Sequence, residues 1–209
     1  MEMILVDWFD SSSGANLLTK KLLSNSMKRI GRFLLFVMSW GVIMGPCWAE
    51  TGIEERIEVK YTIEKQNKKF FIGLPLRTNN DECSIAMPAH KERFFKEGML
   101  QRIPNKMNGN ILAVYTDYEG DYTKPYTWIL GCEVSSLDLV PEGLVGKVIP
   151  SSEYAVFTTE GSFPQGLIAA WQEIWKSNLK RSYSTDFEVY RSDFDPHSNP
   201  QVKVYISIH

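Results

Sequence analysis

Apolar and polar residues alternate along several short segments in the first half of the chain, which is the pattern of a half-buried β-strand. The clearest case is 57–63, where four apolar side chains fall on one face: Ile57, Val59, Tyr61 and Ile63. Further strands are predicted at Lys69–Leu76, Ile111–Thr116 and Tyr126–Val134. Between the second and third of these, Pro88–Glu97 is a short helix candidate that buries Phe94 and Phe95, with Pro88 acceptable only in its first turn.

The second half repeats this order of elements. Strands are predicted at Leu144–Ile149, Tyr154–Thr159, Asp186–Arg191 and Val202–Ile208. Between the second and third of these strands lies an amphipathic helix, for which Ser162 is the expected N-cap and Pro164 an early helical residue. Its apolar stripe has the spacing of one helical face and consists of Leu167, Ile168, Trp171, Ile174, Trp175 and Leu179.

The two halves resemble a duplicated unit. Val114-Tyr115 recurs 75 residues later as Val189-Tyr190, and Pro125 recurs as Pro200 at the same offset. A repeated strand–helix–strand–strand unit predicts an α+β domain with two pseudo-symmetric halves, mostly antiparallel sheet and helices on one side.

Residues 27–49 have the order of a secretory signal peptide. Lys28, Arg29 and Arg32 precede an apolar run of 14 residues, 33–46, which is shorter than the ~18 residues of a membrane-spanning helix. Cys47-Trp48-Ala49 then resembles a cleavage site before Glu50. We therefore expect a periplasmic or secreted bacterial protein, and contact with a membrane only through this segment if it stays uncleaved. An uncleaved anchor and a buried helix are the alternatives.

The signal assignment divides the chain into four parts. Residues 1–26 are interpreted as a mispredicted N-terminal extension, since Met27 is a natural start, although a long basic leader is an alternative. Residues 50–67 are a linker and first strand, and 68–209 form the folded domain. The first 49 residues hold 5 of the 23 Lys and Arg residues and 3 of the 25 Asp and Glu residues, which leaves about −4 on 50–209. This charge argues against a nucleic-acid partner.

The cysteine and histidine residues do not indicate a metal site or a disulfide framework. Cys83 and Cys132 remain after cleavage and could form a disulfide in an oxidising compartment, or stay as two thiols. His90, His197 and His209 are isolated and are interpreted as surface or terminal residues. No metal site and no cofactor are expected.

The order of short motifs over 68–208 resembles the AraC-type effector-binding superfamily, also called gyrase-inhibitor-like, and most of all its integron-associated, stand-alone type. The matching segments are Ile103–Asn105, Ala113–Glu119, Leu130–Val134, Val140–Leu144, Ile149-Pro150, Tyr154–Phe157, Trp171–Trp175, Phe187–Tyr190 and Val204–Ile208. The resemblance implies two pseudo-symmetric halves around a ligand cleft. It also implies that the cleft binds hydrophobic, often cationic, compounds and that Glu188 is its carboxylate.

The residues around Glu188 suit such a cleft. Tyr190 shares its strand face, and Tyr115 is the counterpart of Tyr190 in the first half. Tyr126 and Trp128 share a face of the next strand. A carboxylate among aromatic rings favours a lipophilic cation. There are two ordinary alternatives. Glu188 could be solvated at a strand edge, and the aromatic rings could serve only to pack the core. The core alternative applies most to Trp171 and Trp175.

Three functions follow from these observations. The first is an exported, non-enzymatic protein that binds a small hydrophobic or cationic molecule. The second is a hydrolase of the same superfamily in which Glu188 works with Tyr190 or Tyr115. The third is a protein-interaction module of the envelope. Export, and the short distance from Glu50 to the matching region, argue against transcription regulation and gyrase inhibition.

Overall fold

Apolar runs rich in β-branched and aromatic residues form strands that are mostly buried on both faces in 60–209, the part of the chain that the computed structural model describes. The elements are β1 (Thr62–Gln66), β2 (Lys69–Thr78), α3 (Cys83–Lys96), α4 (Met99–Arg102), β3 (Ile111–Thr116), β4 (Tyr126–Val134), β5 (Val145–Ile149), β6 (Ser152–Thr158), α5 (Gln165–Lys176), β7 (Thr185–Tyr190) and β8 (Lys203–Ser207). The boundaries predicted for β3 and β4 are confirmed, and those of β2, β5, β6, β7 and β8 are close.

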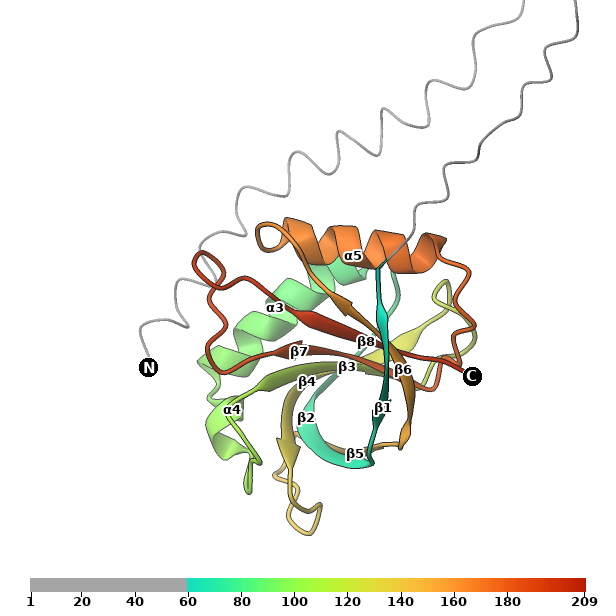
Figure 1. Cartoon of the computed structure of the whole chain (residues 1–209). Coiled ribbons are helices and arrows are strands. Elements are labelled where there is room, and N and C mark those ends of the chain that lie inside the picture. Colours follow the sequence, from blue (N-terminus) through green and yellow to red (C-terminus); the bar gives the residue numbers. More distant parts are fainter. Residues whose placement is uncertain (1–59) are drawn as a thin grey trace, which may run out of the picture. The chain divides into compact units, whose positions relative to one another are not determined.

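The strands form one antiparallel sheet in the order β1-β6-β8-β7-β3-β4-β2-β5 (Figure 1). This order is symmetric about the β7–β3 pair, with β8 matching β4, β6 matching β2 and β1 matching β5. In that central pair Ala113 lies opposite Glu188, and the same two residues are 75 positions apart in the chain. A pseudo-two-fold axis therefore passes between them. The predicted α+β fold of two pseudo-symmetric halves is confirmed.

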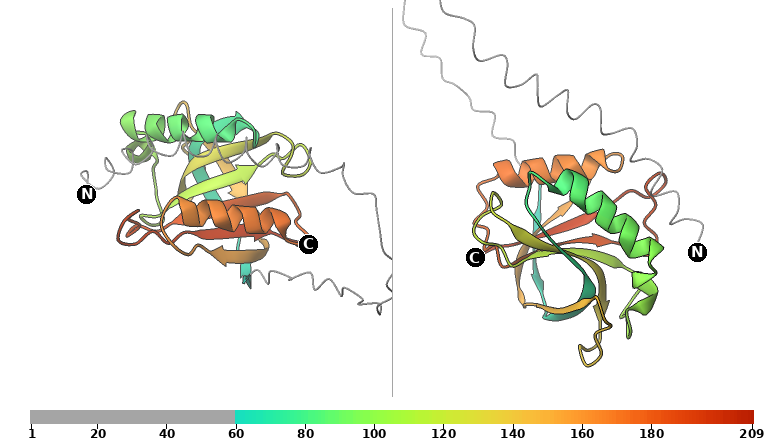
Figure 2. Two further views of the ribbon diagram at one scale, coloured as in Figure 1. Left: turned by 90° about the horizontal axis from the view of Figure 1, so that it is seen from above. Right: turned by 180° about the vertical axis from the view of Figure 1, so that it is seen from behind.

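The sheet separates two apolar cores. One face carries the larger core, which is completed by Phe94 of α3, Met99 of α4 and Trp171 and Ile174 of α5. Figure 2 shows α3 and α5 on this same side of the sheet. The sheet is strongly curved, like half of a barrel (Figure 1). Its other face lies on the concave side and carries the second core, which consists of Phe71, Val114, Ile129, Phe187 and other residues of 71–205.

β2 and β4 approach each other closely at a pair of glycines. Gly73 lies opposite Gly131 in the β2–β4 register. A Cβ on Gly131 would meet the carbonyl oxygen of Ile72 at 2.0 Å, and a Cβ on Gly73 would meet that of Leu130 at 2.5 Å. Both distances are impossible for real atoms, so the curl of the sheet at this point requires glycine on both strands.

The helix predicted at Pro88–Glu97 begins five residues earlier, at Cys83, and ends at Lys96. Asn79 supports the early start, because its side-chain oxygen accepts hydrogen bonds from the N–H groups of Asp81 and Glu82. Pro88 thus lies inside the helix rather than in its first turn. Because Pro88 has no N–H group, the carbonyl oxygen of Ser84, four residues earlier, does not receive a hydrogen bond from it. Both residues are exposed, so water can bond to this carbonyl and the proline is tolerated.

Three further boundary predictions are wrong. Of the strand predicted at 57–63, residues 57–59 lie outside the described residues; the strand that the structure describes covers Thr62–Gln66, and Ile63 is exposed on this edge strand. Ser162 does not cap α5: the residue at the N-cap position is Pro164, and Ser162 contributes only its carbonyl, which accepts the N–H of Gly166. Leu179, the last residue of the predicted stripe, lies beyond the end of α5 at Lys176.

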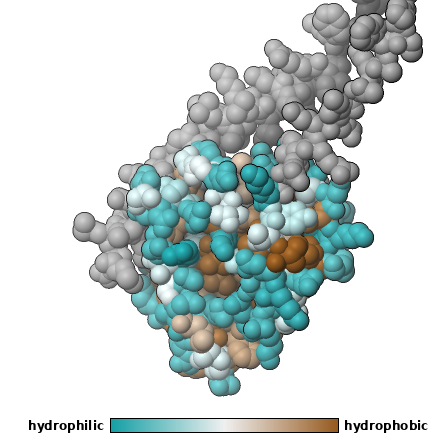
Figure 3. All heavy atoms as spheres, in the orientation of Figure 1, coloured by the Kyte–Doolittle hydropathy of each residue, from teal (hydrophilic) through white to brown (hydrophobic). Residues whose placement is uncertain are grey.

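The predicted signal segment 27–49, residues 1–26 and most of the linker lie outside the described residues. Within 60–209, every helix is too short or too polar to cross a membrane. The face of the domain drawn in Figure 3 is mostly hydrophilic, with separate hydrophobic patches. The large apolar side chains that are exposed include Ile63, Ile85 and Leu139.

The possible disulfide between Cys83 and Cys132 is not formed, and both thiols are free. Cys83 begins α3, and its thiol donates to the carbonyl oxygen of Asn80. Cys132 is buried in β4, six residues beyond Tyr126, whose side chain interacts with Cys83. Six residues of strand span roughly 20 Å, far more than the ~7 Å limit between the Cα atoms of a disulfide.

Candidate functional site

Glu188 is a buried carboxylate at the centre of the sheet. It lies on β7, on the face that α3 and α5 cover, and only 2% of it is exposed. Three donors contact its two oxygens: Tyr115 Oη at 2.7 Å and Trp171 Nε1 at 2.7 Å on Oε1, and Tyr190 Oη at 2.6 Å on Oε2. The alternative of a solvated Glu188 at a strand edge is therefore wrong.

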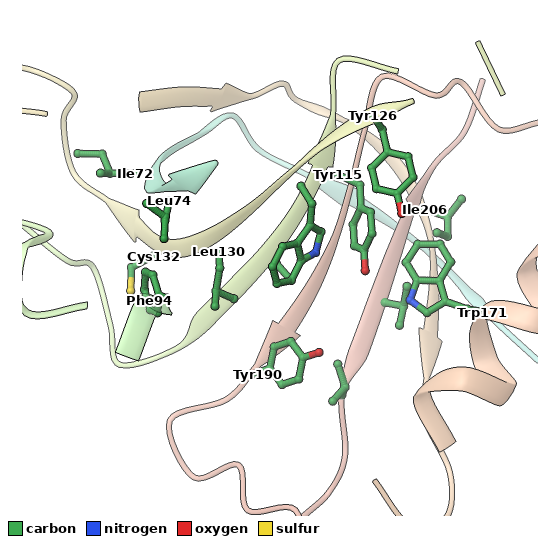
Figure 4. Close-up of a cluster of buried hydrophobic side chains, with 14 of the residues drawn as sticks. Ile72, Leu74, Phe94, Tyr115, Tyr126, Leu130, Cys132, Trp171, Tyr190 and Ile206 are labelled. Atoms are coloured by element: carbon green, nitrogen blue, oxygen red, sulfur yellow. The ribbon is translucent and has the colours of Figure 1, made fainter. Parts of the chain in front are cut away.

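The duplicated unit explains how the two tyrosines meet. Tyr115 and Tyr190 are counterparts in β3 and β7, each two residues from the pair that the pseudo-two-fold axis relates, Ala113 and Glu188. Successive residues on one face of a strand are two apart, so both rings extend toward the axis. In Figure 4 the hydroxyls of Tyr115 and Tyr190 and the indole nitrogen of Trp171 point toward a common space. Glu188 occupies this position.

Burial and the charge of Glu188 keep the two tyrosines protonated. Desolvation is the larger cause, and together with the carboxylate it raises the pKa of Tyr115 and of Tyr190 well above 10.0. Both hydroxyls are therefore donors over the whole physiological pH range. Hydrogen bonds to an ionised acceptor are the strong ones, so three of them hold the carboxylate in one orientation.

The remaining predicted site residues complete a ring of aromatic side chains. The ring of Tyr115 lies 5.6 Å from that of Tyr126 and 5.0 Å from that of Trp171. Trp128 is opposite Tyr115 in the β3–β4 register and is almost fully buried. We call Glu188 together with its five aromatic neighbours the aromatic cage, which consists of Tyr115, Tyr126, Trp128, Trp171, Tyr190 and Glu188.

The indole N–H of Trp128 is a free donor within the cage. It is buried and has no hydrogen-bond partner among residues 60–209. Buried donors are nearly always satisfied, so this N–H is an exception among the residues of the cage.

Lys91 of α3 adds a positive charge that the sequence analysis missed. Its Nζ lies 5.8 Å from the ring centroids of both Trp128 and Tyr190. Burial lowers the pKa of Lys91, while the Glu188 carboxylate acts in the opposite sense. A signal was available: Lys91 falls on the same helical face as Met87, Phe94 and Phe95, and a lysine in an apolar stripe is unusual.

A second buried carboxylate lies two residues along β7. Asp186 is fully buried, and its Oδ2 accepts from Arg181 Nη2 at 2.6 Å and from Tyr118 Oη at 2.8 Å. Its Oδ1 accepts from the N–H and hydroxyl of Ser207 at 2.7 and 2.9 Å. This cluster ties β7 to β8 and to the segment before β7.

A small cleft opens beside the cage. It has a volume of about 260 Å³ and is lined by Asn80, Asp81, Tyr122 and Thr123. Asn80 connects it to the cage, because its side-chain oxygen accepts from Tyr126 Oη and its amide donates to the carbonyl of Tyr122, both at 2.9 Å. The cage itself is closed, since all six of its members are buried.

The five predicted ligand residues, Glu188, Tyr190, Tyr115, Trp128 and Tyr126, thus lie together, and their role in binding stays a prediction. Trp171 was assigned to the core, and it packs there while also donating to Glu188. Trp175, assigned to the core as well, is instead exposed and stacks on Tyr122 at 6.0 Å.

The interpretation of His90 as a surface residue is wrong. It is buried, and its Nε2 lies 3.0 Å from the carbonyl oxygen of Leu74. Its ring also lies edge-on to Trp128, with 5.8 Å between the centroids. Among residues 60–209, no three His, Cys, Asp or Glu side chains are grouped closely enough to hold a metal ion.

Known proteins share the sequence pattern and the fold of this chain. Residues 62–208 match the model of the Cass2 family, described as integron-associated effector binding protein. The putative transcriptional regulator protein YobU of Bacillus subtilis is 30% identical over 149 residues, which cover 67% of this chain and 92% of YobU.

Two solved structures are similar in fold. The integron cassette protein VCH_CASS2 of Vibrio cholerae is 27% identical, with a TM-score of 0.54 over 71% of this chain and 95% of its own. SAV2435, solved bound to tetraphenylphosphonium, is 17% identical, with a TM-score of 0.59 over 72% and 94% of the two chains. At that identity, the likeness to SAV2435 concerns the fold alone.

Proposed function

Because the chain belongs to the family of integron-associated effector-binding proteins and carries its small-molecule-binding domain, we propose that it binds a lipophilic cation in the aromatic cage. The observation that carries this proposal is the buried Glu188, which three neutral donors hold among five aromatic rings. A carboxylate in this setting attracts a cation, and each ring face can add about 0.5–2 kcal/mol of cation–π attraction.

The closed cage must open to admit a ligand. Side chains of both helices take part in closing the cage: Trp171 of α5 donates to Glu188, and Lys91 of α3 lies over the ring of Tyr190. A bulky aromatic cation would supply a positive charge to Glu188 and ring contacts in place of those that these side chains lose, which favours it over a small polar ion. The fold neighbour SAV2435 was solved with a cation of this kind, tetraphenylphosphonium. Hydrolysis is the less favoured function, because all three donors already engage the Glu188 oxygens.

A fluorescence titration of the full chain with tetraphenylphosphonium tests the proposal. We expect a saturable change in emission, since Trp128 and Trp171 belong to the cage. Glu188→Gln should weaken binding by about tenfold or more, which corresponds to ~1.4 kcal/mol. Glu173→Gln is the matched control, because it removes an exposed carboxylate from α5. An affinity unchanged in Glu188→Gln, or no saturable response to any lipophilic cation, would overturn the proposal.

We also propose that the domain works outside the cytoplasm. The support is the order of residues 27–49, in which basic residues, an apolar run of 14 residues and a cleavage-like site follow one another. Cell fractionation followed by mass spectrometry of the native protein tests this. We expect an N-terminus at Glu50 in the periplasmic or secreted fraction. A cytoplasmic protein that begins at Met1 would contradict export and would favour the regulatory role that the name of YobU suggests for that relative.

A further inference from the structure

Lys91 differs from a surface lysine in where its ammonium lies. Its side chain is part-buried and turns over the sheet, so that Nζ lies at 5.8 Å from the ring centroids of Trp128 and Tyr190. Both distances are within the ~6 Å range of cation–π attraction. Lys96, one turn further along α3, is exposed and pairs instead with Glu92 on the surface.

The ammonium of Lys91 therefore occupies the same surroundings that would bind a foreign cation. Tyr190, one of its two rings, donates its hydroxyl to Glu188 at 2.6 Å. The carboxylate influences the ammonium directly, since it opposes the lowering of the pKa of Lys91 by burial. A carboxylate in an apolar cage needs a compensating charge, and Lys91 supplies one from within the chain.

On the basis of the function proposed above, we infer that Lys91 is a tethered internal cation, which a ligand must displace and which determines the specificity of the cage. The flexible four-carbon stem of lysine makes displacement possible, because the ammonium can move to water without a change in the backbone. The ion pair of Arg181 and Asp186 is a contrast, since both of those side chains are buried.

Selectivity follows from this competition. A tethered group acts at an effective concentration on the order of millimolar or higher. A small ammonium ion offers the cage nothing that Lys91 does not already offer, so it competes poorly. An aromatic cation buries apolar surface in addition to its charge, at roughly 25 cal/mol per Å², and therefore displaces the lysine.

Titration of lysine variants with tetraphenylphosphonium tests the inference. We expect Lys91→Met to tighten binding by about tenfold, because the ligand no longer competes with an internal cation. A tenfold change in Kd corresponds to ~1.4 kcal/mol of binding free energy. Lys96→Met removes the same charge from the exposed face of α3 and should change the affinity less than twofold. If Lys91→Met binds no tighter than the wild type, or if both variants tighten equally, the inference is wrong although the proposed function stands. If the wild type does not bind at all, the proposed function fails and the inference with it.

A second measurement follows the position of the Lys91 ammonium directly, by NMR. Reductive methylation with ¹³C gives each lysine an NMR signal and keeps its positive charge, and a Lys91→Arg variant identifies the signal of Lys91. In the free protein we expect this signal to be displaced upfield by the ring currents of Trp128 and Tyr190. On saturation with tetraphenylphosphonium it should move to the position of exposed lysines such as Lys96. A Lys91 signal that stays in place while the cation binds would overturn the inference.

Discussion

Asp186 and Glu188 extend from the same face of β7, yet their two carboxylates are stabilised in different ways. Asp186 forms a direct ion pair with Arg181 and accepts three further hydrogen bonds. Glu188 accepts from two tyrosines and a tryptophan, with the ammonium of Lys91 held by neighbouring rings. The first arrangement includes a backbone donor, the N–H of Ser207, whereas every donor to Glu188 belongs to a side chain.

Arg181→Met should destabilise the domain strongly. The substitution leaves the fully buried Asp186 without its counter-charge, and breaking a buried pair in this way costs about 3–5 kcal/mol. Urea unfolding followed by tryptophan fluorescence measures the change. Arg191→Met is the control, because it removes an exposed arginine that pairs with Asp193, and it should cost less than about 1 kcal/mol. Equal effects of the two variants would show that the buried pair is not a structural link.

The stability of the domain should fall on acidification partly because of His90. Burial is the larger cause that lowers the pKa of His90 below its ordinary 6.5. The unfolded chain then binds a proton more readily than the folded one, so the contribution of His90 is present above pH 6.5 and is lost as the pH falls below it. His90→Gln should flatten the dependence of unfolding free energy on pH between 7 and 5 relative to the wild type, measured by urea titration at each pH. The exposed His197→Gln should leave the slope unchanged, and an unchanged slope in His90→Gln would contradict the prediction.

Alkaline pH should act through the buried tyrosines. Desolvation is the main cause that raises the pKa of Tyr115, Tyr118 and Tyr190 well above 10.0, and it raises that of Tyr154 to about 12. Groups with a raised folded pKa stabilise the fold below the unfolded pKa and lose this effect above it. We expect the unfolding free energy to fall above pH 10, with the buried phenols ionising cooperatively as the domain unfolds.

Absorbance at 295 nm and circular dichroism, recorded together, measure this transition. Tyr115→Phe should reduce the slope of stability against pH above 10, whereas Tyr61→Phe, at an exposed position, should not. Phenol ionisation that is complete before circular dichroism changes would contradict the prediction.

Most of the sheet could be predicted from the sequence because short apolar runs rich in β-branched and aromatic residues mark strands that are buried on both faces. Ile111–Thr116 and Tyr126–Val134 are such cases. The start of α3 could not be predicted, because it depends on the side chain of Asn79 and on a proline that ordinary rules exclude from a helix interior. Edge strand β1 also deviates, since little of it is buried against the rest of the domain.

The cage was only partly predictable for a related reason. Glu188, Tyr190 and Tyr115 could be grouped from strand periodicity and the internal repeat, both of which are properties of the chain itself. Trp171 and Lys91 come from helices, and their approach to Glu188 depends on how α5 and α3 pack on the sheet. Helical spacing indicates which face of each helix is buried, but it does not indicate which strand residues that face contacts.

Gly131→Ala should destabilise the domain although it adds a single methyl group. The new Cβ would lie 2.0 Å from the backbone oxygen of Ile72, so β2 and β4 would have to separate. Overpacking of this kind costs about 1–3 kcal/mol, and thermal unfolding measures it. Gly120→Ala is the control, because its nearest contact is the flexible side chain of Lys124 at 3.1 Å. A Gly131→Ala domain as stable as the wild type would show that the strands can separate without loss.

Glu188 lies beside the pseudo-two-fold axis, and its position breaks the symmetry of the two halves. Each half of the duplicated unit supplies one tyrosine, but only the second half supplies an acid, because Ala113 faces Glu188 across the β3–β7 pair. Two carboxylates opposite each other on paired strands would repel. For the function proposed above, a single carboxylate beside the axis of a pseudo-symmetric scaffold predicts one bound cation per chain.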